Sequence, residues 1–161
     1  MTRVALLLTL ALVLVAPAHA QDSIASKDVE PLANLRTANH AMIAAVAGDR
    51  LFVGGPATLL VYDISDPASP QQIGAVPSEG ANEAEDVVTN GRILALGGQR
   101  GVQIYDVTGT APQKLSTIGG GAQVAACIED CRYLWVTGPN AIYDIANPAA
   151  PIASSSPPMI T

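Results

Sequence analysis

The sequence predicts an all-β protein built from consecutive four-stranded sheets, and three observations lead to this fold class. A pair of short motifs recurs three times, and the Tyr-Asp motif of the pair recurs at intervals of 43 and then 38 residues. Around these motifs lie short apolar runs that are rich in Val, Ile, Leu and Tyr and are bounded by Gly, Pro, Asn and Asp. Beyond the first 20 residues, no segment shows the 3.6-residue apolar period of a helix.

The first element, residues 1–20, has the three parts of a secretory signal. Arg3 supplies positive charge, residues 4–15 form an apolar run, and Ala18-His19-Ala20 ends in the Ala-x-Ala pattern. The run would span about 18 Å as a helix, which is too short for a hydrocarbon core of about 30 Å. We therefore expect cleavage after Ala20, a secreted or periplasmic mature protein, and no membrane span after cleavage.

Residues 21–39 form a lead-in to the first repeat, and residues 40–161 divide into three units of about 40–78, 79–119 and 120–161. Each unit contains an arginine that precedes an apolar run and a glycine. Each then contains a Tyr-Asp pair. These two markers are Arg50 with Tyr62-Asp63, Arg92 with Tyr105-Asp106, and Arg132 with Tyr143-Asp144.

The first unit predicts strands at residues 42–47, 51–54, 58–64 and 72–76. Four strands in about 40 residues is the content of one blade of a β-propeller. In the Asp66-Pro67-Ala68-Ser69-Pro70 segment, the prolines fix φ and lack an N–H donor, so they end the third strand and lead to an outer edge strand.

The segment from Tyr62 to Pro70 resembles the LVIVD repeat of secreted bacterial and archaeal β-propellers, and residues 26–35 resemble the segment that precedes its first copy. The resemblance extends over nearly the whole mature chain. It implies a β-propeller outside the cytoplasm and no particular reaction. Propellers close with four to eight blades, so three repeats predict an incomplete propeller, and residues 29–35 are then either the outer strand of its closing blade or a linker. A six-bladed homodimer and a small closed form are the alternatives.

Cys127 and Cys131 are the two cysteines of the chain, and an exported protein meets an oxidising compartment. They flank the turn between the first and second strands of the third unit. Residues that face each other across an antiparallel turn are close enough for a disulfide, which is the structure we expect. Two free thiols, or a redox or metal role, are the alternatives.

Asp63, Asp106 and Asp144 occur at equivalent places in the three units. A catalytic site is asymmetric, whereas a structural feature is repeated in every blade. We interpret these residues as acceptors for backbone N–H groups at the end of the third strand. The three repeated arginines suggest a pairing with acids of the next blade.

Glu83, Glu85 and Asp86 form a weak candidate metal site in the loop predicted before the first strand of the second unit. Inner loops of a propeller meet at its central channel, where carboxylates are ligands suited to Ca²⁺. The spacing does not match an EF-hand, and a solvated acidic loop is the alternative. No other cofactor is indicated.

Composition excludes several functions. The net charge is −6, and it becomes −7 when Arg3 leaves with the leader, so a nucleic-acid partner is not expected. No catalytic residue is identified, because His40 is the one histidine beyond the leader. The sequence favours a non-enzymatic scaffold that binds an unidentified protein, glycan or small ligand on a propeller face. An extracytoplasmic hydrolase or lyase with a metal-assisted site in the channel is the alternative.

Overall fold

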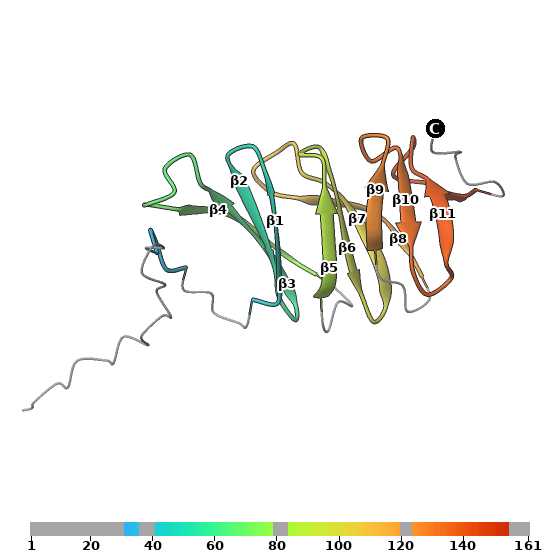
Figure 1. The fold of residues 1–161 in the computed structure, drawn as a ribbon, viewed down its shortest axis with the longest axis horizontal. Coiled ribbons are helices and arrows are strands. Elements are labelled where there is room, and N and C mark those ends of the chain that lie inside the picture. Colours follow the sequence, from blue (N-terminus) through green and yellow to red (C-terminus); the bar gives the residue numbers. More distant parts are fainter. Residues whose placement is uncertain (1–30, 36–40, 79–83, 120–123, 155–161) are drawn as a thin grey trace, which may run out of the picture. The chain divides into compact units, whose positions relative to one another are not determined.

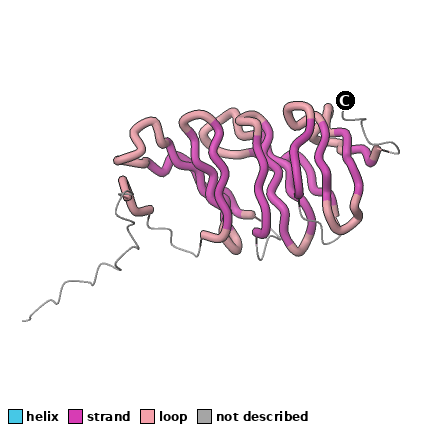
Figure 2. The backbone as a smooth tube through the Cα atoms, in the orientation of Figure 1, coloured by secondary structure: helices cyan, strands magenta, loops and turns pink. Residues whose placement is uncertain are grey.

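The computed structural model describes residues 31–35, 41–78, 84–119 and 124–154. In this part the chain forms strands joined by turns and loops, without a helix (Figure 2). The all-β fold predicted from the sequence is therefore confirmed. Residues 31–35 belong to no sheet, whereas the leader and the rest of the lead-in lie outside the described residues. All the strands fall within one unit, Leu32–Thr161.

The first sheet is an antiparallel meander in which each strand pairs with the next along the chain. Its four strands fall on the four predicted segments, with ends that differ by no more than one residue. They are β1 (Ile43–Ala47), β2 (Arg50–Gly54), β3 (Thr58–Asp63) and β4 (Gln71–Pro77).

The second and third sheets repeat this order of strands, β5-β6-β7-β8 and β9-β10-β11-β12. Both lie within the predicted second and third units. The second sheet contains β5 (Ala84–Thr89), β6 (Ile93–Gly98), β7 (Gly101–Asp106) and β8 (Gln113–Ile118). The third contains β9 (Val124–Ile128), β10 (Tyr133–Val136), β11 (Ala141–Asp144) and the short edge strand β12 (Ile152–Ala153).

An irregularity in strand pairing also recurs. The register between β3 and β4 shifts at Val61 and Tyr62, and the register between β7 and β8 shifts at Ile104 and Tyr105. In both sheets the shift falls at the tyrosine of the Tyr-Asp marker. An extra residue at this place bends the outer strand away from the regular ladder. The sheets are thus copies of one blade-like design.

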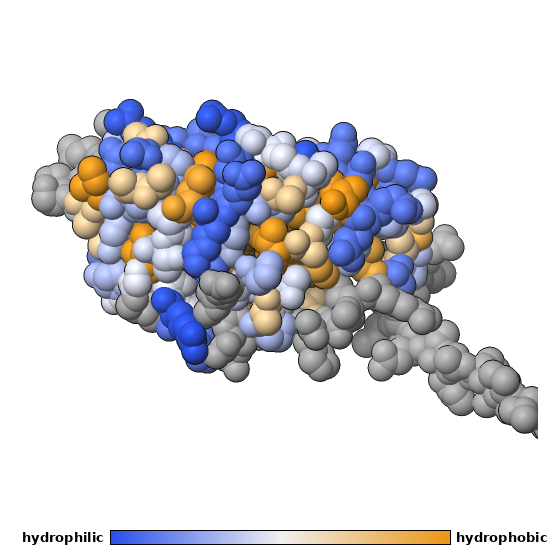
Figure 3. Space-filling model, turned by 180° about the vertical axis from the view of Figure 1, so that it is seen from behind, coloured by the Kyte–Doolittle hydropathy of each residue, from blue (hydrophilic) through white to orange (hydrophobic). Residues whose placement is uncertain are grey.

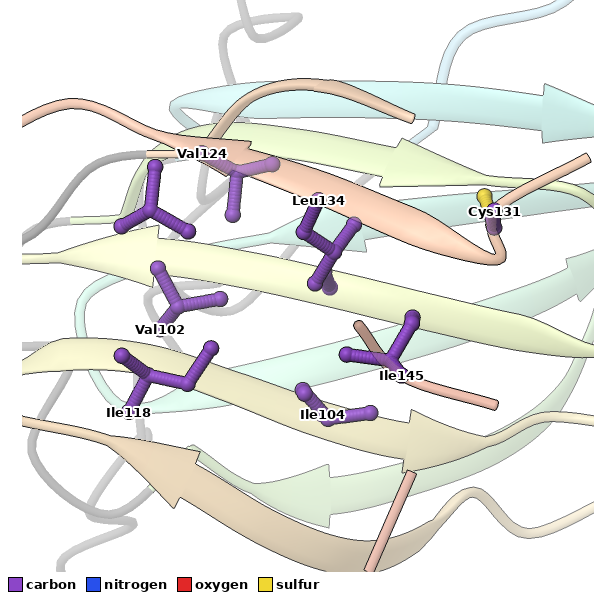
Figure 4. Packing of buried hydrophobic residues seen from close by; sticks show 9 residues of the cluster. Val102, Ile104, Ile118, Val124, Cys131, Leu134 and Ile145 are labelled. Carbon is purple, nitrogen blue, oxygen red and sulfur yellow. The ribbon is translucent and has the colours of Figure 1, made fainter. Parts of the chain in front are cut away.

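The sheets follow one another face to face, with β5 next to β1 and β9 next to β5 (Figure 1). Two apolar cores separate them. The first core joins Phe52, Leu59 and Val61 to residues of the second sheet. The other core joins the opposite face of the second sheet to Leu134, Val136 and Ile145 of the third (Figure 4).

The middle strands of the second sheet are apolar on both faces because they contribute to both cores. On β6, Leu94 and Leu96 belong to the first core, whereas Ala95 between them belongs to the second. On β7, Val102 and Ile104 face the third sheet and Tyr105 faces the first. This alternation is the two-residue period of a strand. It explains why Ile-Leu-Ala-Leu at residues 93–96 has no polar position.

Two glycines of the first sheet allow the second sheet to approach closely. A Cβ atom on Gly54 would lie 3.2 Å from Leu96 Cδ1 and 2.8 Å from Ile43 Cγ1. A Cβ atom on Gly74 would lie 2.3 Å from the carbonyl oxygen of Thr110, which is backbone and cannot move aside easily. The first junction is therefore closed tightly along β2 and β4.

Candidate binding site

The repeated aspartates hold the turn that follows the third strand of each sheet. Asp63 Oδ1 accepts the backbone N–H of Ser65 at 2.8 Å, Asp106 Oδ1 accepts that of Thr108 at 2.8 Å, and Asp144 Oδ1 accepts that of Ala146 at 2.8 Å. This hydrogen bond from residue i+2 defines an Asx turn. The three carboxylates thus have the same backbone partner in every sheet.

Hydrogen bonds lower the pKa of two of these carboxylates. The pKa of Asp63 lies below its usual value mainly because of the hydrogen bonds from Ser65, and the nearby Arg50 adds to the effect. The pKa of Asp106 is lowered first by the Thr108 hydroxyl, which donates to Asp106 Oδ1 at 2.6 Å, and then by the Thr108 N–H. Both carboxylates are charged turn acceptors rather than proton donors.

A second Asx turn follows in the first and third sheets. Asp66 Oδ1 accepts the N–H of Ala68 at 3.0 Å, and Asn147 Oδ1 accepts the N–H of Ala149 at 3.2 Å. In the second sheet Gly109 takes this place in the sequence. The loops after β3 and β11 are therefore two consecutive turns, whereas the loop after β7 has one.

The first hairpin turn of the third sheet is longer than that of the first. Ala47 pairs with Arg50 across two residues, whereas Ile128 pairs with Tyr133 across residues 129–132. Cys127 and Cys131 form a disulfide in this turn, with their Cα atoms 4.4 Å apart. The cysteine pair predicted from the sequence is therefore bonded.

Three consecutive residues of this turn have positive φ without being glycine. The angles are 49° at Glu129, 55° at Asp130 and 60° at Cys131. Each such residue costs roughly 1–2 kcal/mol relative to the right-handed conformation. The disulfide lies across the strained segment, so it stabilises a backbone conformation that the residues alone disfavour.

Backbone hydrogen bonds show that the three repeated arginines are not equivalent. The N–H of Val107 donates to the carbonyl of Arg92, and the N–H of Ile145 donates to that of Arg132, both at 2.8 Å. In the first sheet the corresponding acceptor is the carbonyl of Asp49, also at 2.8 Å. Arg50 is therefore one position further along its strand, on the opposite face, where the second sheet has Ile93.

Arg50 reaches from the first sheet to the second. Its Nη1 donates to the carbonyls of Val107 and Gly109, the latter at 2.9 Å, and its Nη2 lies 3.4 Å from the carbonyl of Thr108. The sequence interpretation of a pairing with acids of the next blade is wrong here, because Arg50 binds backbone oxygens. Arg132 instead lies 3.8 Å from Asp144 of its own sheet and stacks on Tyr133.

A hollow of about 410 Å³ occupies the corresponding place between the second and third sheets. We call it the second-junction hollow. Its walls come from the β5–β6 turn, the disulfide-bonded β9–β10 turn and the loop after β11. The lining residues are Asn90, Arg92, Ile93, Glu129, Asp130, Cys131, Arg132, Ile145, Ala146 and Pro148.

Asn90 bridges the two turns that border this hollow. Its Oδ1 accepts the N–H groups of Arg92 and Ile93, at 3.0 and 2.9 Å, and so shapes the β5–β6 turn. Its Nδ2 donates to the carbonyl of Asp130 at 2.7 Å. The Ser116 hydroxyl donates to the carbonyl of Pro148 at 2.6 Å. Hydrogen bonds from the second sheet thus hold both the β9–β10 turn and the loop after β11.

Comparison with known families agrees with the architecture. The family model named LVIVD repeat matches residues 38–77, a range that contains the whole first sheet, β1 to β4. The chain carries an LVIVD repeat. Neither the curated proteins nor the solved structures contain a significant match to this chain. The second and third sheets repeat the strand order and the Asx turn of the matched LVIVD sheet.

Two of the three residues of the predicted acidic cluster lie in a strand and not in a loop. Glu85 and Asp86 lie within β5, beside a register shift between Ala84 and Asp86, because β5 already begins at Ala84. Glu85 is exposed, whereas Asp86 is half-buried, and burial raises its pKa. Glu83 and His40 lie outside the described residues. Among the residues that the structure describes, no group of three His, Cys, Asp or Glu side chains is placed to hold a metal ion.

The sequence interpretation missed Asn90 and the second-junction hollow. The signal that could have revealed them is a small difference between repeats. Arg50 precedes the first glycine of its Gly-Gly pair by four residues, whereas Arg92 precedes Gly97 by five. In strands with a two-residue period, this offset places the two arginines on opposite faces.

Proposed function

We propose that this protein is a secreted β-propeller repeat protein that acts as a binding scaffold. The observation that carries the proposal is the use of the recurring carboxylates: Asp63, Asp106 and Asp144 each bind a backbone N–H two residues along the chain. Because these carboxylates make the same backbone hydrogen bond in every sheet, their role is to shape the loops and not to catalyse a reaction. What differs between the copies is the edge where neighbouring sheets meet, and differences of this kind provide ligand sites on a repeated framework.

Two features support a location outside the cytoplasm. The first 20 residues have the pattern of a cleaved signal, and Cys127 and Cys131 are bonded, as is usual in oxidising compartments. No helix in the described part of the chain is long and apolar enough to cross a membrane.

Export is tested by expressing the full chain with a C-terminal tag in a bacterial host and sequencing the N-terminus of the extracytoplasmic product. We expect the product to start at Gln21. Ala20→Tyr is the matched control, because a large side chain at the cleavage position blocks processing. An unprocessed chain that stays in the cytoplasm would contradict the proposed location.

The absence of catalysis is tested with chromogenic ester, phosphate, glycoside and peptide substrates, each with Ca²⁺ and with EDTA. We expect no turnover above the buffer rate in either condition. Turnover that EDTA abolishes would support the hydrolase or lyase alternative instead. In that case Asp63→Asn, Asp106→Asn and Asp144→Asn would show whether the repeated carboxylates take part.

A further inference from the structure

We propose that the second-junction hollow binds a guanidinium group, and that its ligand is arginine or a small arginine-like compound with a free carboxylate. This inference deepens the proposed binding function and rests on it. It comes from a comparison within the molecule, because the first junction already contains a guanidinium group at the corresponding place, supplied by Arg50.

At the first junction, the loop after β7 presents three consecutive carbonyls to Arg50, those of Val107, Thr108 and Gly109. A guanidinium is a planar fork of N–H donors with no acceptor, so a set of converging carbonyls suits it. The chain thus demonstrates, in its own fold, which group this backbone arrangement binds.

At the second junction, the corresponding loop follows β11. Ile145 takes the place of Val107, as shown by their equivalent hydrogen bonds to Arg132 and Arg92. Ile145, Ala146 and Pro148 of this loop line the hollow. The loop begins with the same Asx turn, in which Asp144 accepts the N–H of Ala146, so its first residues follow the course seen in the second sheet.

The second junction lacks the side chain that would fill the space. Ile93 occupies the position of Arg50 and packs against the apolar core instead of reaching the loop. The volume left open, about 410 Å³, falls within the roughly 300–1,000 Å³ of small-molecule sites. A guanidinium that enters from solvent would therefore meet the surroundings that Arg50 meets.

The charges around the hollow favour a ligand with both signs. Glu129 and Asp130 provide negative charge on the wall, whereas Arg92 and Arg132 provide positive charge. Arg132 already lies 3.8 Å from Asp144, but Arg92 is exposed on the rim. A guanidinium alone would be repelled by Arg92, whereas a carboxylate on the same ligand would pair with it. Arginine is the simplest compound that has both groups.

The test is a titration of the purified chain with L-arginine. Binding is measured by calorimetry and by the NMR shifts of the Asn90 side-chain amide and the Ala146 N–H. Three probes separate the components of the ligand: agmatine lacks the carboxylate, N-acetyl-arginine amide mimics an arginine within a peptide, and L-lysine lacks the guanidinium. We expect arginine to bind with a Kd of about 1 mM or tighter. Agmatine and the amide should bind about three- to tenfold more weakly, and lysine should not bind measurably.

Variants locate the site. Ile93→Arg supplies an internal guanidinium and should abolish arginine binding. Ile93→Met, whose side chain is unbranched like that of arginine but apolar, should preserve it. Because Ile93→Arg disturbs a core position, Asp130→Asn provides a second measure. It should weaken binding about threefold without blocking the hollow. Arg50→Ala should create a second arginine site at the first junction.

Besides a failure of arginine to bind, two results would overturn the inference. One is equal binding of lysine and arginine, and the other is arginine binding that Ile93→Arg leaves unchanged. If arginine does not bind but the chain is exported and shows no turnover, the inference fails and the scaffold function stands. Turnover of a substrate, by contrast, would contradict the scaffold function itself.

Discussion

The two junctions between neighbouring sheets are built from sheets with the same order of strands, but their edges differ. At the first junction, Arg50 extends across to three carbonyls of the second sheet and fills the edge. At the second junction, Ile93 stops at the core and a hollow remains. The exchange of an arginine for an isoleucine, together with the longer β9–β10 turn, thus accompanies a hollow where the first junction has an internal contact.

Away from this edge the junctions are alike. Each contains an apolar core with fully buried residues, such as Leu94 in the first and Leu134 in the second. On the face shown in Figure 3, apolar residues are interspersed with polar ones, and polar residues gather along the upper edge. The two junctions have similar cores but different edges. We therefore make separate predictions for the cores and for the edges.

The largest effect is expected in the cores. Leu94→Ala and Leu134→Ala should each lower the free energy of unfolding by about 2–5 kcal/mol, because each removes a fully buried side chain and leaves a cavity. Urea unfolding followed by circular dichroism measures both. If the two junctions are separate packing units, the losses in the double variant should add to within about 0.5 kcal/mol. Strong non-additivity would show that the two cores act as one.

The next effect distinguishes the two arginines. Arg50→Ala should cost about 1.5–3 kcal/mol, since it removes charged hydrogen bonds to carbonyls at the first junction. Arg92→Ala is the matched control and should change stability by less than about 0.5 kcal/mol, because Arg92 is exposed. Thermal unfolding of both variants gives the comparison. Equal losses would mean that the register assigned to the arginines is wrong.

We expect the disulfide to affect the second junction only. Reduction of the Cys127–Cys131 bond should cost about 2 kcal/mol, as expected from the chain entropy of so short a loop. The reduced turn should also relax, because residues 129–131 have positive φ. Hydrogen exchange should therefore increase around β9 and β10 and stay unchanged around β1 and β2. Faster exchange in the first sheet would contradict a local role for the bond.

The fold was predictable because repetition gave the same signal three times. The Tyr-Asp markers and the prolines located β3, β7 and β11 and the turns that follow them. The strands of the first unit were placed within one residue because each apolar run is bounded by turn-forming residues. Local chemistry of this kind can be read from a sequence without knowledge of what the strands pack against.

The site was not predictable in the same way, because it depends on register and on contacts between sheets. Arg50 and Arg92 look alike in the sequence, yet one residue of offset places them on opposite faces. Similarly, Glu85 and Asp86 were expected in a loop, and Glu and Asp are uncommon in strands. Pairing of β5 with β6 overrides that preference.

The smallest effect concerns pH and two aspartates of the second sheet whose pKa values shift in opposite directions. Hydrogen bonds from Thr108 lower the pKa of Asp106, so the ionised form stabilises the fold above the ordinary pKa of 3.8. That contribution disappears as the pH falls through the lowered value. Asp106→Asn should therefore reduce the melting temperature at pH 7 and have less effect in acid.

Burial raises the pKa of Asp86, so the sign is reversed: its ionised form destabilises the fold at neutral pH. Asp86→Asn keeps an oxygen that can accept the N–H of Val87, as Asp86 Oδ1 does at 2.8 Å, but removes the charge. This variant should melt slightly higher than the parent at pH 7, and the gain should disappear as the pH falls toward 3.8. Melting curves of both variants between pH 3 and pH 7 test the pair together. Parallel curves for the two would contradict the assignment of hydrogen bonding as the dominant influence at Asp106 and burial at Asp86.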